Sequence, residues 1–332
     1  MDVFDWIKKN LNPRVCDSAE FIYDEMDSQS ERCLPIIYRP FDTTSRGDWR
    51  ERGFTFDYLY STGSGRLLDF GPGDGWPSLN VAPFAGEVVG VDASKRRVEA
   101  CEENAERLGI ENAAFVHVPH STRLPFPDGH FDGAMAASSV EQTPDPLFAL
   151  EEIYRVIRPG GRLRVWYEAL ARYRDGRERE VWVRSVGGET AQLILTDRHI
   201  DEERADQFNL VFDVSAQHLN KTITGGTGEI TLDDVTPEAL EEVAPRITDV
   251  RACPLRHPSG RTLAAWLADV GFREVLPTES GADAAGSLFD QLAPQDRPSD
   301  LEGVDALVKP VVEKAIETPA AIEGDPMITA MK

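Results

Sequence analysis

The sequence predicts an α/β protein built on a doubly wound, mostly parallel sheet. Between residues 65 and 170, short apolar runs alternate with stretches of helical period, and a glycine-rich turn follows the first run. Alternation of this kind places helices on both faces of a parallel sheet. Ligands of such sheets bind beyond the carboxyl ends of the strands. We therefore expect the functional residues in the turns that follow the strands.

The length and the charge limit the organisation and the partners of the chain. Its 332 residues correspond to about two domains. The formal charge is −23, from 35 basic and 58 acidic residues, so the protein is strongly acidic. A nucleic-acid binder needs cations that displace counterions from phosphates. We therefore expect no nucleic-acid partner.

Neither a membrane partner nor a metal site is expected. The chain lacks an apolar run of about 18 residues, and its first residues show no basic-then-apolar signal pattern. These observations predict a cytoplasmic protein. The four cysteines are scattered, without the paired spacings of metal or redox sites. Cys101 shares a helical face with Val98 and Ala105, which predicts a place in the core.

Residues 1–60 are predicted to form a helical arm. Proline and glycine separate three short helical patterns, at 4–7, 19–26 and 49–60. The arm is rich in aromatic residues, most of which must serve packing. Three of its tyrosines are candidates for the lining of a substrate pocket: Tyr23, Tyr38 and Tyr58.

Residues 61–169 are predicted to form the core of the fold. The five apolar runs that we interpret as strands are 66–70, 87–92, 114–118, 131–136 and 161–166. Helical periodicity between them is clearest at 94–108 and 146–156.

The alternation stops at residue 170. Three segments have the composition of antiparallel strands: 180–184, 191–195 and 208–212. The earlier pattern resumes with a helix at 261–270 and a strand at 272–276. We therefore interpret 170–257 as an inserted α+β lid and 258–280 as the closing helix and strand of the core. Residues 281–332 are predicted to be a helical tail. Trp182, in the insertion, is a further candidate pocket residue.

The strongest local signal is the turn after the first predicted strand, Asp69-Phe70-Gly71-Pro72-Gly73-Asp74-Gly75. Glycines at alternate positions let the backbone turn sharply and leave no side chain between it and a ligand. The following helix is expected to present its amino-terminal N–H groups there. Trp76 stands where the dinucleotide fingerprint needs a glycine, which argues against NAD and FAD. A P-loop is excluded because no Gly-Lys-Ser/Thr ending follows.

Two acidic residues refine the interpretation of this turn. Asp69 precedes the first glycine by two residues, and its carboxylate suits a cation or an ammonium group rather than a phosphate ester. Asp92 ends the second predicted strand, where an acid can accept hydrogen bonds from both ribose hydroxyls of a nucleoside. Capping of the helix that starts near Ser94 is the alternative role of Asp92.

These residues and two further segments resemble class I S-adenosylmethionine-dependent methyltransferases, most closely the branch that acts mainly on small molecules. The further segments are LPFPDGHFD at 124–132 and YRVIRPGGRL at 154–163. The resemblance covers residues 65–170, and a second, shorter segment at 263–275 is also similar to the family. It implies a Rossmann-like sheet of seven strands, S-adenosylmethionine as cofactor and S-adenosylhomocysteine as product.

The resemblance also implies which residues contact the cofactor. They are Asp69 near the methionine end, Gly71, Gly73 and Gly75 beneath it, Asp92 at the ribose, Ala93 at the adenine and Ser138 at the end of the fourth strand. The family normally places an acid before Leu124, at the adenine amino group. Here that place holds His120, followed by Ser121. A backbone carbonyl or the Ser121 hydroxyl is the alternative partner of adenine.

The residue that would accept a proton is a second departure from the family. Members often carry Glu-His after the fourth strand, whereas this chain has Glu141-Gln142, and an amide does not take up a proton. Gln142 and Ser139 are therefore candidates for the substrate pocket. His120 is the candidate catalytic base, on its placement alone.

The sequence thus predicts an enzyme that transfers a methyl group from S-adenosylmethionine to a small or medium-sized metabolite, at O, N, C or S. The transfer is an in-line displacement, and alignment alone can supply about 7–11 kcal/mol. The absence of a base motif therefore does not count against the prediction. The alternatives are a non-catalytic cofactor-binding regulator or scaffold and a protein methyltransferase. The arm and the insertion are the parts available to choose the acceptor.

Overall fold

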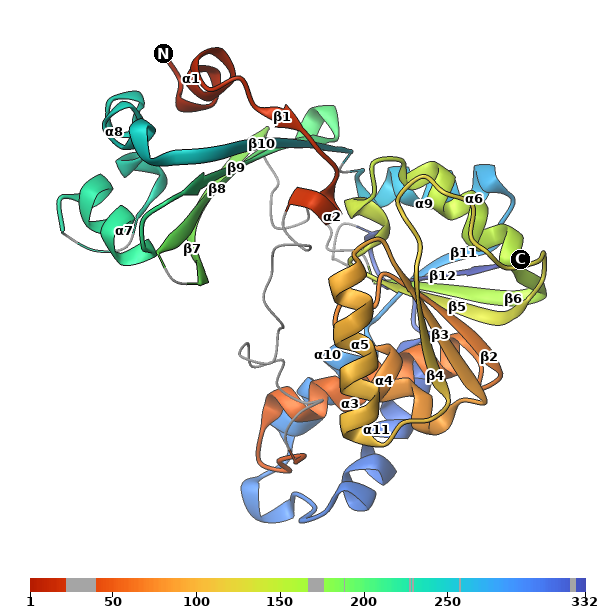
Figure 1. The fold of residues 1–332 in the computed structure, drawn as a ribbon. Helices are drawn as coiled ribbons and strands as arrows, with labels where there is room; N and C mark the ends of the chain where they lie inside the picture. Colours follow the sequence, from red (N-terminus) through yellow and green to blue (C-terminus); the bar gives the residue numbers. More distant parts are fainter. Residues whose placement is uncertain are drawn as a thin grey trace. The chain divides into compact units, whose positions relative to one another are not determined.

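The computed structural model describes residues 1–21, 40–166, 176–187, 189–226, 228, 230–256, 258–322 and 327–332 (Figure 1). The chain divides into two compact units. The first, which we call the core unit, consists of Ser28–Glu141, Asp145–Ala171 and Ser259–Lys332. The second unit consists of Met1–Asp27, Gln142–Pro144 and Arg172–Pro258.

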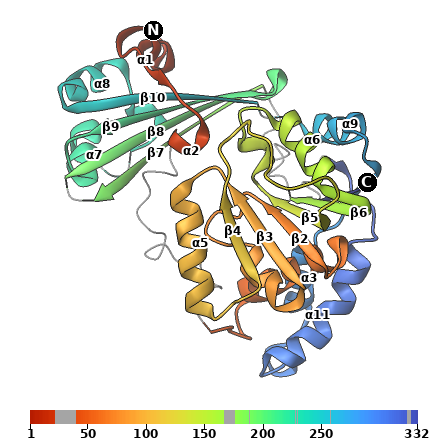
Figure 2. The same cartoon turned by 45° about the vertical axis from the view of Figure 1, so that its right-hand side comes forward.

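The core unit is built on a seven-stranded sheet with the order β11-β12-β6-β5-β2-β3-β4 (Figure 1). Figure 2 shows β6, β5, β2, β3 and β4 from another side. Its strands are β2 (Arg66–Phe70), β3 (Glu87–Asp92), β4 (Ala113–His117), β5 (Phe131–Ala137), β6 (Ile157–Trp166), β11 (Arg273–Thr278) and β12 (Met327–Met331). Strands β2 to β6 are parallel, and β12 runs antiparallel to both of its neighbours. The predicted doubly wound, mostly parallel sheet is confirmed.

Helices cover both faces of this sheet. They are α3 (Arg46–Thr62), α4 (Ser78–Val81), α5 (Lys95–Leu108), α6 (Pro146–Val156), α9 (Gly260–Val270), α10 (Gly281–Gln291) and α11 (Leu301–Ala315). Successive strand residues point to opposite faces. Leu68 accordingly packs in a cluster with α6 and α9, whereas Leu67 packs in a cluster with α3, α10 and α11. Both faces are apolar, and for this reason the strands are near-continuous apolar runs.

One ion pair inside the core unit is fully buried. Arg164 of β6 donates two hydrogen bonds to Asp57 of α3, at 2.7 and 2.9 Å. The same guanidinium donates to the hydroxyls of Thr278 and Thr329, on β11 and β12. Asp57 also accepts the backbone N–H of Gly281 at 2.7 Å. This pair therefore joins α3 and β6 to β11, β12 and the beginning of α10.

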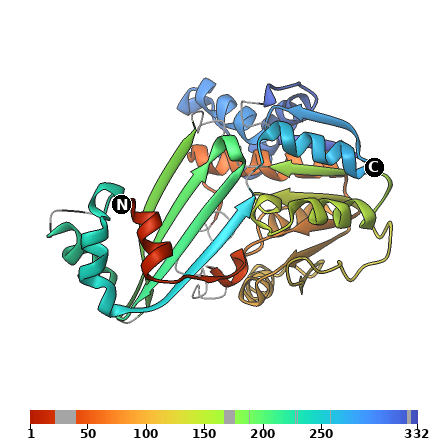
Figure 3. The ribbon, with the colours of Figure 1, turned by 90° about the horizontal axis from the view of Figure 1, so that it is seen from above.

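The second unit is built on a five-stranded sheet with the order β1-β10-β9-β8-β7. Its strands are β1 (Arg14–Val15), β7 (Arg177–Gly187), β8 (Thr190–His199), β9 (Arg204–Phe212) and β10 (Ile247–Arg256). Its helices are α1 (Val3–Asn10), α2 (Ser18–Phe21), α7 (Ala216–Thr224) and α8 (Pro237–Val243). Helix α1 lies along one face of this sheet (Figure 3). Its apolar stripe packs on Leu193, Leu195 and Phe208.

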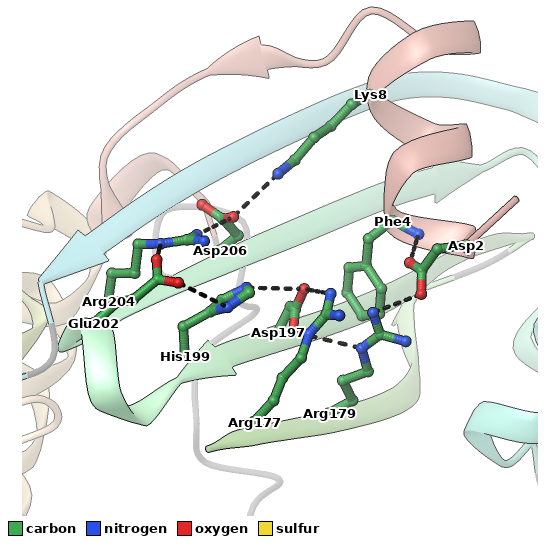
Figure 4. A network of polar contacts seen from close by, with 10 residues as sticks. All are labelled: Asp2, Phe4, Lys8, Arg177, Arg179, Asp197, His199, Glu202, Arg204 and Asp206. Carbon is green, nitrogen blue, oxygen red and sulfur yellow. Dashed lines mark hydrogen bonds and ion pairs between the residues drawn. The ribbon is translucent and has the colours of Figure 1, made fainter.

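A network of charges fixes α1 on this sheet (Figure 4). At the beginning of the helix, Asp2 caps the N–H of Phe4 and forms an ion pair with Arg179 of β7 at 2.6 Å. At its end, Lys8 forms an ion pair of 3.1 Å with Asp206 of β9. Between these points, Asp197 is 2% exposed and forms ion pairs with Arg177, Arg179 and His199. Burial favours a raised pKa for Asp197, but the hydrogen bond from Arg177 and the nearby charges of Arg177, His199 and Arg179 together outweigh it, and the pKa is lowered.

The division of the chain differs from the predicted one at both ends. The predicted arm of residues 1–60 is split, because α1 packs on the second sheet while α3 packs in the core unit. The predicted tail of 281–332 contains β12, which lies inside the core sheet between β6 and β11. The sequence did not predict this strand, Met327–Met331. The three strands expected in the insertion are present as β7, β8 and β9.

Among the described residues, no helix combines the length and the apolar character that a membrane crossing requires.

Candidate functional site

Four turns of the core unit meet at the carboxyl edge of its parallel strands. Strand β2 lies between β3 and β5, so the strand order reverses its direction at this point. A topological switch of this kind opens a crevice between the ends of the strands. The carboxyl ends of β2 and β3, together with the turns after β2, β3, β4 and β5, carry all of the residues that the sequence predicts for the cofactor.

The turn after β2 has the backbone that its glycines were predicted to allow. Gly71, Gly73 and Gly75 have φ angles of 75°, 60° and 110°, which disfavour any side chain. A Cβ on Gly71 would lie 2.4 Å from Ser139, and one on Gly75 would lie 2.4 Å from Leu79. A Cβ on Gly73 would meet nothing closer than 3.7 Å. Packing therefore requires Gly71 and Gly75, while Gly73 leaves the backbone open to a ligand.

One face of α5 holds this turn in place. Asn104 donates to the carbonyl of Asp74 at 2.9 Å, and Cys101 donates to the carbonyl of Gly73 at 3.2 Å. Arg97 forms an ion pair with the Asp74 carboxylate. Positions 97, 101 and 104 share a helix face, and that spacing is the signal that sequence reasoning missed. Cys101 is buried, as predicted.

Asp69 is fully buried at the end of β2. Its Oδ2 accepts the N–H and the hydroxyl of Ser78, at 3.0 and 2.6 Å. The first N–H of α4 is thus used inside the protein, whereas the sequence predicted that it faces a ligand. Within the described part of the chain, Oδ1 of Asp69 has no hydrogen-bond partner. Burial, together with the nearby charge of Asp92, raises the pKa of Asp69 to about 7.

Asp92 ends β3 as predicted and connects the glycine turn to α5. Its Oδ2 accepts the N–H of Gly73 at 3.3 Å, and its Oδ1 accepts the N–H of Ser94 at 2.9 Å. The Ser94 hydroxyl caps α5 itself. Asp92 is half-buried, and each carboxylate oxygen can accept a second hydrogen bond. The adjacent Ala93 is also half-buried.

The turn after β4 contains His120 and Ser121. His120 is half-buried and Ser121 is exposed, with a φ angle of 56°. The turn after β5 contains a second left-handed residue, Ser138, with a φ angle of 49°. Left-handed backbone at a residue other than glycine is concentrated at functional sites. Both positions are among those that the sequence predicts for the cofactor.

The other predicted residues of the turn after β5 have internal partners. The Ser139 hydroxyl donates to the carbonyl of Phe70 and so supports the glycine turn. The Ser138 hydroxyl donates to Glu141 at 3.0 Å. Gln142 belongs to the second unit, where its carbonyl accepts the hydroxyl of Ser18.

The aromatic pocket candidates are dispersed. Tyr58 is fully buried against Trp76, with ring centroids 6.2 Å apart, and its hydroxyl has no hydrogen-bond partner among the described residues. Trp76 donates its indole N–H to Glu51 at 2.7 Å, and burial raises the pKa of this glutamate. Trp182 is 49% exposed on β7. Tyr23 and Tyr38 lie outside the described residues.

In the ranges that the structure describes, no three or more His, Cys, Asp or Glu side chains form a group that could hold a metal ion.

Comparison with known proteins identifies part of the core unit. Residues 68–165 match the family model described as a methyltransferase domain. The 27-O-demethylrifamycin SV methyltransferase of Amycolatopsis mediterranei is 30% identical over 136 residues, 40% of this chain and 50% of that protein. The demethylmenaquinone methyltransferase of Thermus thermophilus is 38% identical over 118 residues, 35% of this chain and 51% of that protein. The chain thus spans about half the length of these relatives.

Among solved structures, the CcbJ methyltransferase of Streptomyces caelestis is similar with a TM-score of 0.49 and 14% identity. The similarity covers 88% of this chain and 98% of that one.

Proposed function

Because residues 68–165 form a methyltransferase domain of the class I, S-adenosylmethionine-dependent family, we propose that this protein methylates a small or medium-sized metabolite. Two of the curated relatives are named for small-molecule acceptors, which supports this choice of acceptor class. The acceptor atom, O, N, C or S, stays open. A cytoplasmic location and the absence of nucleic-acid and membrane partners remain predictions from the sequence.

The turn after β2 carries the proposal. Asp69 is a fully buried carboxylate with one oxygen that lacks a hydrogen bond, and Gly73 leaves an open side on the backbone next to it. A buried carboxylate is costly unless a cation or a donor satisfies it. S-adenosylmethionine carries both an ammonium and a sulfonium group, so these residues fit its methionine end. Asp92 would accept hydrogen bonds from the ribose hydroxyls.

The chain's own contribution to the transfer is alignment of the acceptor with the reactive methyl group, which the bound cofactor supplies on its sulfonium. Alignment can lower the barrier by about 7–11 kcal/mol. A general base would add about 10²–10⁴-fold. His120 is the candidate for that role on its placement after β4, whereas Gln142 cannot take up a proton.

Replacement of Asp92 by Ala is expected to weaken cofactor binding at least about tenfold, because two charge-assisted hydrogen bonds to the ribose would be lost. Isothermal calorimetry with S-adenosylhomocysteine measures this effect. Glu87→Gln is the matched control, since Glu87 begins the same strand and forms an ion pair with Arg66 at the protein surface. An affinity that Asp92→Ala leaves unchanged would show that the ribose binds elsewhere.

The second unit is the part that we assign to acceptor choice. Trp182 alternates with Val181 and Val183 along β7 and so lies on the sheet face opposite α1. The same face carries the buried polar side chains of Gln192, Thr196 and Asn209. The exposed indole offers a ring face against which an organic acceptor can pack.

Trp182→Ala is therefore expected to raise the KM for the acceptor roughly two- to tenfold, the equivalent of one aromatic contact. The affinity for S-adenosylhomocysteine should not change. Leu276→Ala, at an exposed apolar residue of the core unit, is the control. Steady-state kinetics with an acceptor that the wild type methylates provides the measurement, and an unchanged KM would remove Trp182 from the acceptor site.

The same binding and turnover assays distinguish two other functions. A protein that binds S-adenosylmethionine but forms no S-adenosylhomocysteine with a broad metabolite panel would be a regulator or a scaffold. Turnover with a protein, and not with metabolites, would make it a protein methyltransferase.

A further inference from the structure

Two side chains of α6 hold the segment that follows β4. Glu152 accepts the backbone N–H of Leu124 at 2.7 Å. Arg155 donates to the carbonyls of Leu124 and Phe126, at 2.9 and 2.7 Å, and to the carboxylate of Asp128 at 2.9 Å. At the far end of the segment, Gly129 donates its N–H to the Arg155 carbonyl. We call Glu152 and Arg155 the α6 clamp.

The α6 clamp is a partly buried, charged pair. Arg155 donates two hydrogen bonds to Glu152, at 2.8 and 2.6 Å, and Glu152 is 8% exposed. Burial favours a raised pKa for Glu152, but the hydrogen bonds from Arg155 and Leu124, together with the charges of Arg155 and Arg123, outweigh it, and the pKa is lowered. The clamp is therefore charged at neutral pH, and its charge-assisted hydrogen bonds are of the strong kind.

The segment that the clamp holds has no carboxylate of its own before Leu124. Between Val118 and Leu124 the chain reads Pro-His-Ser-Thr-Arg. An adenine amino group that docks here must find another acceptor, and the backbone offers several. Ser121 has left-handed backbone, which turns the peptide groups on its two sides away from a regular strand.

We propose that Glu152 and Arg155 are positioning residues that orient the backbone of residues 118–124 to recognise the adenine of the cofactor. This inference rests on the proposed function. A side-chain carboxylate can adjust its rotamer to a ligand, but a backbone group is only as well placed as the segment that carries it. Binding groups must stay within about 0.5 Å of their productive positions. Residues 118–124 have no helix or strand of their own. The clamp anchors them at their end, through both backbone groups of Leu124, and so limits how far their backbone can move.

The test compares two ligands in two variants. S-adenosylhomocysteine and 5′-deoxy-5′-methylthioadenosine share the adenosine moiety, but the second lacks the amino-acid end. Arg155→Ala is expected to weaken both ligands by the same factor, about tenfold or more. Arg155→Lys keeps the charge beside Glu152 but loses the fork that reaches two carbonyls at once. Compared with Arg155→Ala, we expect Arg155→Lys to regain the thermal stability of the wild type but only part of its affinity for the two ligands.

Arg158→Ala is the matched control. Arg158 lies three residues further on and forms an exposed ion pair with Asp132, without a hydrogen bond to residues 118–128. It should leave both affinities unchanged. Hydrogen exchange of the Leu124 amide gives an independent readout, which should accelerate in both Arg155 variants and not in the control.

Three results are distinguishable. If the wild type binds neither ligand, the proposed function fails. If the wild type binds both, and the Arg155 variants bind them equally well although Leu124 exchanges faster, the positioning role fails alone. If Ser121→Ala lowers the affinity for both ligands as much as Arg155→Ala does, the Ser121 hydroxyl recognises the adenine. The proposal that backbone groups recognise it is then wrong.

Discussion

Replacement of Asp57 by Asn is expected to lower the free energy of unfolding of the core unit by about 3–5 kcal/mol. The substitution leaves the guanidinium of Arg164 without a counter-charge in a place where both side chains are 0% exposed. The remaining partners of Arg164 are two hydroxyls and a carbonyl, which do not neutralise it. Native-state hydrogen exchange of the amides in β2 and β5 measures the change in this unit directly.

A surface pair serves as the control for this prediction. Glu87→Gln breaks the ion pair with Arg66, whose two side chains are 44% and 42% exposed. Such pairs contribute about 0–1 kcal/mol. The double variant Asp57→Leu with Arg164→Met removes both charges and should regain most of the loss. A loss no larger for Asp57→Asn than for Glu87→Gln would refute the buried pair as a stabilising link.

Replacement of Asp69 by Asn is expected to change stability and binding in opposite directions. In the ligand-free protein, burial raises the pKa of Asp69 from 3.8 to about 7. The unfolded chain ionises this group near pH 4 and the folded chain only near pH 7, so its contribution to stability falls as the pH rises through that window. Above about pH 7, the ionised Asp69 lowers the free energy of unfolding by up to about 4 kcal/mol, since each pKa unit corresponds to roughly 1.4 kcal/mol.

Asp69→Asn removes this penalty, so the ligand-free variant should be more stable than the wild type at pH 8 and equally stable at pH 3.5. The same variant should bind S-adenosylmethionine less tightly, because the cation then lacks its carboxylate. For the wild type, affinity should rise with pH up to about 7, since a cationic ligand favours the ionised form. Thermal melts and calorimetry over this range give both quantities.

Asp132→Asn is the control for Asp69→Asn. Hydrogen bonds from the Arg66 backbone and from Arg158 lower the pKa of this exposed carboxyl, so its removal should not stabilise the protein at pH 8. If Asp69→Asn destabilises the ligand-free protein at pH 8, then the ionised carboxylate is satisfied inside the protein and is not waiting for a ligand.

Much of the core unit was predictable because its signals are local. Residues 146–156 form α6 as predicted, since Asp145 provides a cap, Pro146 a first helical residue and the apolar residues a helical period. Asp92 ends β3 as predicted, and the three glycines have the backbone that their spacing suggested. The role of Ser78 was not foreseen, because its contact with Asp69 depends on how the turn folds back.

The sequence alone determined the features that depend on neighbouring residues. These are the strand and helix periods, the glycine turn and the order of the family's motifs. The tertiary structure decided which distant residues meet. Arg155 holds Leu124 from a helix 31 positions away, β12 enters the sheet beside β6, and α1 packs on β8 and β9, which begin at Thr190 and Arg204. The physical reason is that a period or a turn is encoded in consecutive residues. A hydrogen bond or an apolar contact between distant segments exists only once the chain has brought them together.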